Sequence, residues 1–300
     1  MTSTTHPDVV PASSIAFFCR HPLERRSPDP DWADEARAAR EAGFEVELVD
    51  HDRLVAGEDP RVDRRTGRTP AVYRGWMLRA EAYARLDERL GERGVDLVHD
   101  GTAYRTAHHL PEWYRYLRGR TPRSVWLPWD GALDPDGVRH ALADLGSGAA
   151  VVKDYVKSAK HAWREATFLP DAGDLDAVLR VVRRFLEIQG EDLAGGLVFR
   201  EWLALESGPG GRALEHRLIV LDGRLLAIGP HPDLAEAGEP PGAEPFLELA
   251  RRVPGRFFAV DVARTTSGEA VVIEMGDGQV STLPTGVDLD RFYGDLRRSL

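Results

Sequence analysis

Short apolar runs alternate with longer amphipathic segments over about the first 120 residues of the chain. Apolar runs bounded by polar or glycine positions are typical of buried strands, and apolar positions with a helical repeat are typical of helices. The pattern predicts strands at 15–19, 45–49, 70–73 and 95–99, and helices at about 31–43, 77–90 and 104–117. Strands and helices that follow one another in turn form parallel sheets. We therefore expect an α/β, Rossmann-like N-terminal domain.

The pattern changes after about residue 120. It predicts helices at 136–145, 175–189 and 289–298, strands at 149–155 and 196–205, and hairpins at 214–228 and 257–275. The pairs Asp222-Gly223 and Ser267-Gly268 stand between the apolar runs of the two hairpins, and such pairs favour two-residue turns. Hairpins build antiparallel sheets, so this half is expected to be α+β. We predict one domain at 1–120 and a second region at 121–300.

Composition narrows the class of protein. The net charge of −10 is spread along the chain and argues against a general nucleic-acid binder, whose footprint is a basic face. No apolar run approaches the ~18 residues that span a bilayer, and the N-terminus lacks a signal pattern. A single cysteine, Cys19, cannot form an intramolecular disulfide and is typical of a buried small apolar residue. A cytoplasmic protein is therefore expected.

The chain contains only three lysines, Lys153, Lys157 and Lys160, and all three fall in the segment VVKDYVKSAKHAW. Elsewhere arginine supplies the positive charge. Lysine carries a compact ammonium, whereas arginine carries a planar fork, so a phosphate held as a point charge in a tight pocket favours lysine. Since the segment begins as a buried strand, the sequence predicts a phosphate site here rather than a chance cluster on the surface.

The last predicted hairpin brings two carboxylates together. If Ser267-Gly268 is a two-residue turn, counting outward pairs Asp261 with Glu274, and their Cβ atoms lie ~4.5–5.5 Å apart. Both side chains are flanked by apolar residues, so their repulsion must be offset. A Mg²⁺ ion, an arginine partner, or protonation of one carboxyl group would each offset it. We favour the metal ion.

Two further residues extend this site. Asp277, in the loop after Glu274, either completes the metal shell or is an ordinary turn aspartate. Arg217 shares one face of its predicted strand with Glu215, so it either pairs with that glutamate or reaches a phosphate. We favour the phosphate.

These segments come in a recognisable order: a strand ending in lysine, the acidic segment LVFREWLALES, the hairpin segment EHRLIV and the acid-bearing hairpin VDVART…VVIEMGDG. The sequence resembles ATP-grasp proteins, in particular a clade of small ATP-grasp proteins found in bacteria and phages. The resemblance covers about residues 120–285. Residues 1–120 are similar to a pre-ATP-grasp domain in their rhythm only.

The resemblance implies that ATP and Mg²⁺ are the cofactors. It implies the following roles: Lys153 and Lys160, with Lys157 beside them, on the phosphates; the backbone of Glu201, Trp202 and Leu203 on adenine; Glu206 on the ribose; Arg217 near the γ-phosphate; and Asp261 and Glu274 on the metal. Lys153, Lys160 and Arg217 are then the catalytic residues.

The chain departs from the family pattern in two places. Gly276 stands where relatives usually carry asparagine, so Asp277 is inferred as a substitute metal ligand. The phosphate-covering loop is usually glycine-rich, but residues 151–172 contain no glycine.

The function that the resemblance implies is an ATP-dependent carboxylate–amine ligase, which forms an amide or peptide bond through an acyl phosphate. The alternatives are an ATP-grasp phosphotransferase and a nucleotide-binding module without turnover. The expected substrate is a small molecule, an amino acid or a peptide, and the sequence does not indicate an oligomeric state. Arg74 and Trp76 follow a predicted strand end, where α/β sheets bind ligands, so they are candidate substrate residues, with a surface arginine beside a core tryptophan as the alternative.

Overall fold

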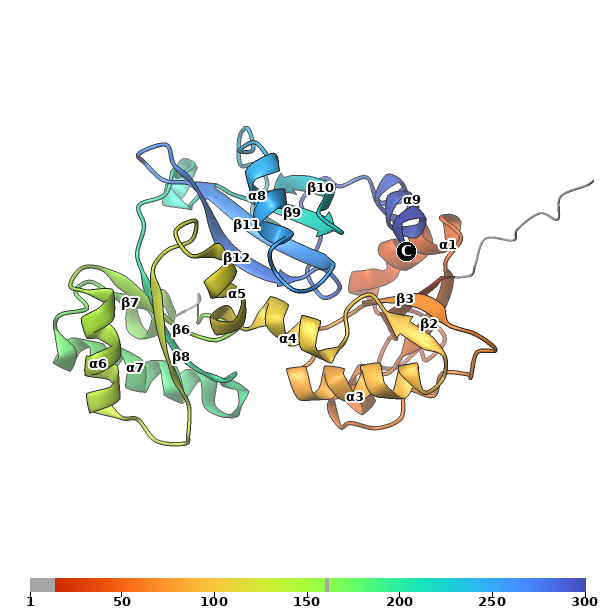
Figure 1. The fold of residues 1–300 in the computed structure, drawn as a ribbon, viewed down its shortest axis with the longest axis horizontal. Helices are drawn as coiled ribbons and strands as arrows, with labels where there is room; N and C mark the ends of the chain where they lie inside the picture. Colours follow the sequence, from red (N-terminus) through yellow and green to blue (C-terminus); the bar gives the residue numbers. More distant parts are fainter. Residues whose placement is uncertain (1–13, 160–161) are drawn as a thin grey trace, which may run out of the picture. The chain divides into compact units, whose positions relative to one another are not determined.

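The computed structural model describes residues 14–159 and 162–300. The chain divides into two compact units, residues 1–100 with 288–300, and residues 101–287 (Figure 1). Among the described residues, no helix is both long and apolar enough to span a membrane.

The first unit contains a parallel sheet with the strand order β2-β1-β3-β4. Its elements are β1 (Ile15–Cys19), η1 (Pro30–Trp32), α1 (Ala33–Glu41), β2 (Glu45–Val49), α2 (His51–Val55), β3 (Thr69–Arg74), α3 (Ala80–Gly91), β4 (Val95–Leu97) and α9 (Leu289–Ser299). Every residue of β1 is buried, as an apolar run without alternation predicts for a central parallel strand. The strands are parallel, as the order of the sequence indicates. The description of this unit as a Rossmann-like pre-ATP-grasp domain stays a prediction.

The second unit contains two antiparallel sheets within its described residues. One has the order β5-β8-β6-β7 and is called the β6 sheet; the other has the order β10-β9-β11-β12 and is called the β11 sheet. The elements are α4 (Gly101–His108), α5 (Leu110–Leu117), β5 (Ser124–Pro128), α6 (Pro135–Leu145), β6 (Ala150–Asp154), η3 (Trp163–Thr167), β7 (Phe168–Leu169), α7 (Leu175–Gln189), η4 (Gly190–Asp192), β8 (Gly196–Glu201), η5 (Pro209–Gly211), β9 (Glu215–Leu221), β10 (Arg224–Pro230), α8 (Glu244–Ala250), β11 (Phe257–Arg264) and β12 (Ala270–Asp277).

Each sheet of the second unit has its own apolar core (Figure 1). Helices α6 and α7 pack on the β6 sheet, where Val182 and Phe185 meet Val152 and Phe199. Helices α5 and α8 pack on the β11 sheet, where residues such as Trp113 are buried with the apolar face of its strands. The opposite faces of both sheets are therefore the ones available for a site.

Most predicted elements lie where the sequence indicates, with one clear difference. The helix expected at 104–117 is two helices, α4 and α5, which meet at His109. Pro111 causes the break, because proline lacks an N–H and is accommodated in the first turn of a new helix. The short elements α2, β5, β7 and α8 were not predicted.

The compact units meet at residue 100 rather than at the expected 120. The reason is that α4 and α5 pack with the second unit, where Trp113 and Leu117 are buried in the core of the β11 sheet. The last helix, α9, belongs to the first unit and packs on α1. The functional division at 120 stays a prediction.

A buried ion pair ties α9 to the first unit. The Arg74 guanidinium is fully buried and donates to both carboxylate oxygens of Glu35, with N–O distances of 2.7–3.0 Å. The Tyr293 hydroxyl of α9 donates to the same carboxylate at 2.5 Å, and Trp32 lies 5.0 Å from the guanidinium. Burial alone lowers the pKa of Arg74, but the charge of Glu35 outweighs it and leaves the pKa raised.

We predict that Glu35→Gln destabilises the protein by about 3 kcal/mol, because it leaves the buried Arg74 charge without its counterion. Glu41→Gln is the matched control, since it removes the same charge from the same helix but breaks only the exposed pair with Arg37. The control should change the free energy of unfolding by less than about 1 kcal/mol. Denaturant unfolding measures both, and equal effects would contradict the assigned role of the buried pair.

Candidate functional site

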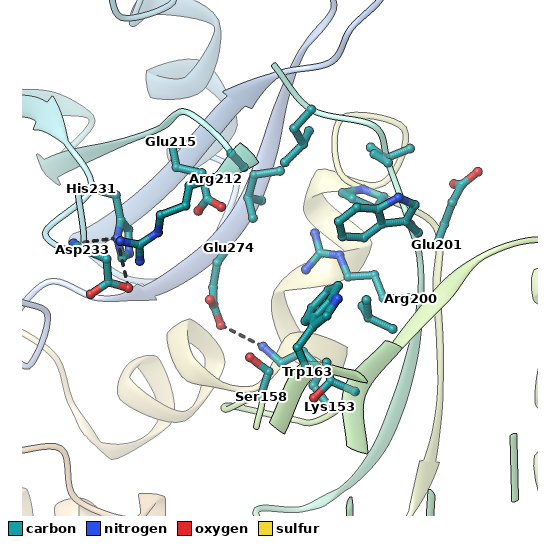
Figure 2. A pocket seen from close by; sticks show the side chains of 18 of the residues that line it. Lys153, Ser158, Trp163, Arg200, Glu201, Arg212, Glu215, His231, Asp233 and Glu274 are labelled. Carbon is teal, nitrogen blue, oxygen red and sulfur yellow. Dashed lines mark hydrogen bonds and ion pairs between the residues drawn. The ribbon is translucent and has the colours of Figure 1, made fainter. Parts of the chain in front are cut away.

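A cavity of about 520 Å³ lies within the second unit and is lined by residues of both sheets. Figure 2 shows Lys153, Trp163 and Arg200 on one side, Glu215, His231 and Asp233 on the other, and Glu274 between them. Its volume is in the range of sites for small molecules and cofactors. This cavity is the candidate functional site.

Lys153 reaches the cavity because of strand alternation in β6. Val152 and Asp154 turn toward the buried side, whereas Val151 and Lys153 line the cavity. The Lys153 ammonium donates to Glu274 Oε1 at 2.8 Å and to the Val156 carbonyl at 3.2 Å. The side chain is only 8% exposed, so this charge is nearly removed from water.

The turn after β6 is shaped by Asp154 rather than by the lysines. The Asp154 carboxylate accepts the backbone N–H groups of Val156, Lys157 and Ala194. Burial raises the pKa of Asp154, and the three N–H donors oppose that rise. Lys157 itself is exposed and does not line the cavity, and Lys160 lies outside the described residues.

The predicted pairing of Asp261 with Glu274 is present, but the turn that produces it differs from the prediction. Instead of a two-residue turn, Thr265 and Glu269 close a three-residue loop, with Gly268 at φ +88°. A bulge at Ile273 then shifts the register by one residue in the opposite sense. The two differences cancel at Asp261.

The bulge also decides which side chains line the cavity. Val272 and Met275 are buried in the core, whereas the two residues between them, Ile273 and Glu274, both line the cavity. In a regular strand two consecutive residues point to opposite faces. The extra residue therefore directs Glu274 toward Lys153 while both core positions are kept.

Asp261 has an arginine partner. Arg217 Nε and Nη2 donate to the two Asp261 carboxylate oxygens at 2.7 and 2.8 Å, from the adjacent strand β9. Arg217 also donates to the Thr282 carbonyl and lies 3.0 Å from His231 Nε2, and it does not line the cavity. Burial lowers the pKa of Arg217, but Asp261 outweighs it and raises the pKa. Arg217 thus pairs with Asp261, not with Glu215.

Asp277 has the role of a turn residue. Its carboxylate is fully buried and accepts the backbone N–H of Gln279 at 2.7 Å. Within the described part of the chain, no group of three or more histidine, cysteine, aspartate or glutamate side chains could hold a metal ion. The facing carboxylates of Asp261 and Glu274 still fit Mg²⁺, which prefers oxygen ligands and is commonly bound by one or two carboxylates together with phosphates.

The predicted hinge follows β8. Glu201, Trp202 and Leu203 line the cavity, whereas Glu206 is exposed and does not. The N–H groups of Glu201 and Trp202 already donate to the Arg123 and Ala149 carbonyls. The hinge predicted from the sequence is therefore at the cavity, and its ribose residue is not.

Trp163 adds an aromatic wall that was not predicted. Its ring stacks on Phe168 with centroids 5.6 Å apart and lies 5.3 Å from the Trp202 ring. Both tryptophans line the cavity, and Trp202 is 44% exposed. These rings offer a flat partner for a base.

Arg200 on β8 was also missed. It is 6% exposed, lines the cavity, and donates to the Thr121 hydroxyl at 2.6 Å and the Val272 carbonyl at 3.4 Å. No acidic side chain of the described residues lies within ion-pair distance of it. Burial lowers the pKa of Arg200 to about 10, so it is charged at neutral pH without a counterion. An arginine inside the apolar run LVFREW is the sequence signal that could have found it.

The remaining predicted residues lie elsewhere. Arg74 is fully buried against Glu35 and offers no surface to a substrate carboxylate, so we assign it a structural role. Trp76 is 42% exposed in the first unit, where its indole N–H donates to Asp29. His231 and Asp233, which line the cavity, were not predicted.

The chain has a recognisable family match. A family model of the ATP-grasp domain (family 3 of its clade) matches residues 144–296, which include both sheets' cavity-lining strands β6, β8, β9 and β12. None of the curated proteins matches the chain.

Solved structures share the fold. A RimK domain ATP-grasp protein from Sphaerobacter thermophilus DSM 20745 is 18% identical with a TM-score of 0.62 over 96% of this chain and 99% of that chain. D-cycloserine synthetase DcsG is 18% identical with a TM-score of 0.60, over 95% and 99%. ATP-grasp ligase PsnB, complexed with a minimal precursor, Mg and ADP, is 20% identical with a TM-score of 0.57, over 95% of each chain. At these identities the likeness shows the ATP-grasp fold.

Arg200→Met tests whether the unpaired guanidinium serves a ligand. We predict that the free energy of unfolding stays within about 1 kcal/mol of the wild type, because a desolvated charge is removed along with its hydrogen bonds. Affinity for an ATP analogue should fall at least about tenfold, since a charge-assisted hydrogen bond is lost.

Calorimetry measures the affinity. Arg264→Met is the control, because it removes the same charge from β11 at a position that does not line the cavity. An unchanged affinity in Arg200→Met would show that Arg200 only holds the two sheets together.

Proposed function

The chain belongs to the ATP-grasp domain family, and so to the ATP-grasp ligases, and we propose that it is an ATP-dependent carboxylate–amine ligase. It would form an amide or peptide bond through an acyl phosphate. The observation that carries the proposal is the meeting of Lys153, Glu274 and the hinge residues 201–203 in one cavity.

The cationic side chains on the β6 sheet supply the phosphate contacts in this proposal. Lys153 and Arg200 line the same cavity, and both are buried. A buried cation without an acidic partner, as Arg200 is, gains most from an anionic ligand. Lys160 is proposed as a further phosphate residue on the family resemblance, and the exposed Lys157 as its neighbour.

Glu274 and Asp261 would hold Mg²⁺ in the proposed site. The ion would neutralise charge on the phosphates as the γ-phosphoryl group is transferred. Glu274 is the more accessible ligand, because its side chain is 36% exposed while that of Asp261 is 6% exposed. Arg217 then acts on the site through Asp261, rather than by direct contact with the γ-phosphate.

Adenine would lie at the hinge, between Trp163 and the backbone of 201–203. Base stacking on aromatic rings contributes about 1–3 kcal/mol per base in single-stranded nucleic-acid complexes, and the same contact is open to a nucleotide here. Leu203 is the proposed backbone contact, since the N–H groups of Glu201 and Trp202 already have partners.

The chemistry is an acyl transfer in two steps. A substrate carboxylate oxygen attacks the γ-phosphorus, the bond to the β–γ bridging oxygen breaks, and ADP leaves. An amine then attacks the carbonyl carbon, the C–O bond to phosphate breaks, and phosphate and a proton leave. Lys153 and Arg200 hold charge on the transferred group, and positioning supplies much of the rate.

The far wall of the cavity favours an amino acid or a peptide as the substrate. Glu215 and Asp233 line it together with Arg212, so both signs of charge are present (Figure 2). Such a wall suits a molecule that carries both an ammonium and a carboxylate. The similar structure of PsnB with its minimal precursor adds support for a peptide.

An isotope experiment tests the reaction. The protein is incubated with Mg²⁺, ATP, hydroxylamine and a pool of amino acids and short peptides whose carboxylates carry ¹⁸O. We expect ADP, hydroxamates, and ¹⁸O in the inorganic phosphate, because one carboxylate oxygen leaves with phosphate. A phosphorylated acceptor without free phosphate would establish a phosphotransferase instead, and the absence of ADP would leave only a binding module.

Two substitutions test the residues. Lys153→Ala and Glu274→Gln should each lower ADP formation at least about 100-fold, as the loss of one preorganised electrostatic contact does in other enzymes. Both should keep the melting temperature of the wild type within a few degrees.

Glu269→Gln is the matched control. It removes a negative charge from the same hairpin at an exposed position outside the cavity and should leave ADP formation unchanged. Wild-type rates in both site variants would rule out this cavity as the active site.

A further inference from the structure

Lys153 and Glu274 form an ion pair between two different sheets. Lys153 stands on β6 and Glu274 on β12, and their N–O distance is 2.8 Å. Figure 2 shows the two side chains pointing toward one another in the cavity. With a lysine side chain only 8% exposed, the pair lies mostly out of water, so the attraction is stronger than at a surface.

The pair joins the two groups that the proposed function assigns to different ligands. The ammonium is the phosphate contact, and the carboxylate is the metal contact. Each must therefore give up the other before it can serve its own ligand. Lys153 offers phosphate an ammonium that already has a carboxylate, and Glu274 offers metal a carboxylate that already has a cation.

The second carboxylate pair differs in kind. Arg217 grips both oxygens of Asp261 and is held further by the Thr282 carbonyl and His231. Lys153 holds Glu274 through a single oxygen, and its other contact is the Val156 carbonyl. A bidentate guanidinium with several anchors is a fixed contact, whereas a single ammonium contact can be exchanged.

We propose that Glu274, through its ion pair with Lys153, makes the cavity select metal-complexed nucleotide over metal-free nucleotide. This inference rests on the proposed function. Metal-free nucleotide must compete with Glu274 for Lys153 and also meets the charge of that carboxylate. When the metal arrives with the nucleotide, it takes the carboxylate and the phosphates take the ammonium, so both charges change partners together.

Such an exchange makes nucleotide and metal binding cooperative at this site. By linkage, the factor by which the metal strengthens nucleotide binding equals the factor by which nucleotide strengthens metal binding. The contribution of the ion pair to this factor is what a double-mutant cycle isolates, since it separates the contact from the charge of Glu274 alone.

The experiment measures the Kd of AMP-PNP by calorimetry for the wild type, Glu274→Gln, Lys153→Met and the double variant, in EDTA and in excess MgCl₂. In EDTA, Glu274→Gln should bind AMP-PNP at least about fivefold more tightly than the wild type, within the usual range of coupling. In the Lys153→Met background the same substitution should change the Kd less than about twofold. In MgCl₂, Glu274→Gln should bind more weakly than the wild type.

Several controls keep the result interpretable. Glu269→Gln removes an equal charge from the hairpin and should not change the Kd in EDTA, and melting curves confirm that each variant is folded. Glu274 is 36% exposed, so Lys153→Met does not leave a deeply buried carboxylate behind.

Two outcomes would overturn the inference alone. The first is an equal gain from Glu274→Gln in both backgrounds, which would mean simple repulsion, and the second is no gain in either. A wild-type chain that binds no AMP-PNP in MgCl₂ would instead overturn the proposed function, and the inference with it.

Discussion

Charges can stand on the facing sides of two sheets only if each has a partner, because a charge taken out of water without one is costly. In the second unit this constraint is met by cation–carboxylate pairs. Lys153 of the β6 sheet meets Glu274 of the β11 sheet, and within the β11 sheet Arg217 meets Asp261. The cavity is therefore lined by groups that are already neutralised in pairs, with Arg200 as the exception.

The carboxylate pair could be predicted from sequence because the signal is local. Asp261 and Glu274 stand on two apolar strands joined by a short glycine-containing turn, and counting outward from that turn pairs them. The count was right although the turn was not of the predicted type, since the loop is one residue longer and the bulge at Ile273 restores the register. Neither feature has a clear signature in the apolar pattern. The pattern did fix which face each carboxylate shares with its neighbours.

Partners distant in the chain could not be predicted in the same way. Arg74 was a candidate for a substrate carboxylate because it follows a strand end, but Glu35 and Tyr293, 39 and 219 positions away in the sequence, enclose it. Arg200 was overlooked for the opposite reason. A charge within an apolar strand is ordinarily paired, and only the assembled structure reveals that its neighbours are a hydroxyl and a carbonyl. Burial and pairing are properties of the fold, while residue type and spacing are properties of the sequence.

The use of lysine and arginine follows the same division between fixed and exchangeable contacts. Arginine stands where the contact is multiple and locked: Arg74 on Glu35 and Arg217 on Asp261 each use a bidentate fork, which only a planar guanidinium provides. Lys153 stands where one carboxylate oxygen is held by one ammonium. A chain that uses arginine almost everywhere would lose little by using it here too, if the contact were permanent. The retention of lysine at this position is explained if the ammonium must exchange a carboxylate for a phosphate, because a compact charge on a flexible stem can turn from one oxygen to another without breaking a paired geometry.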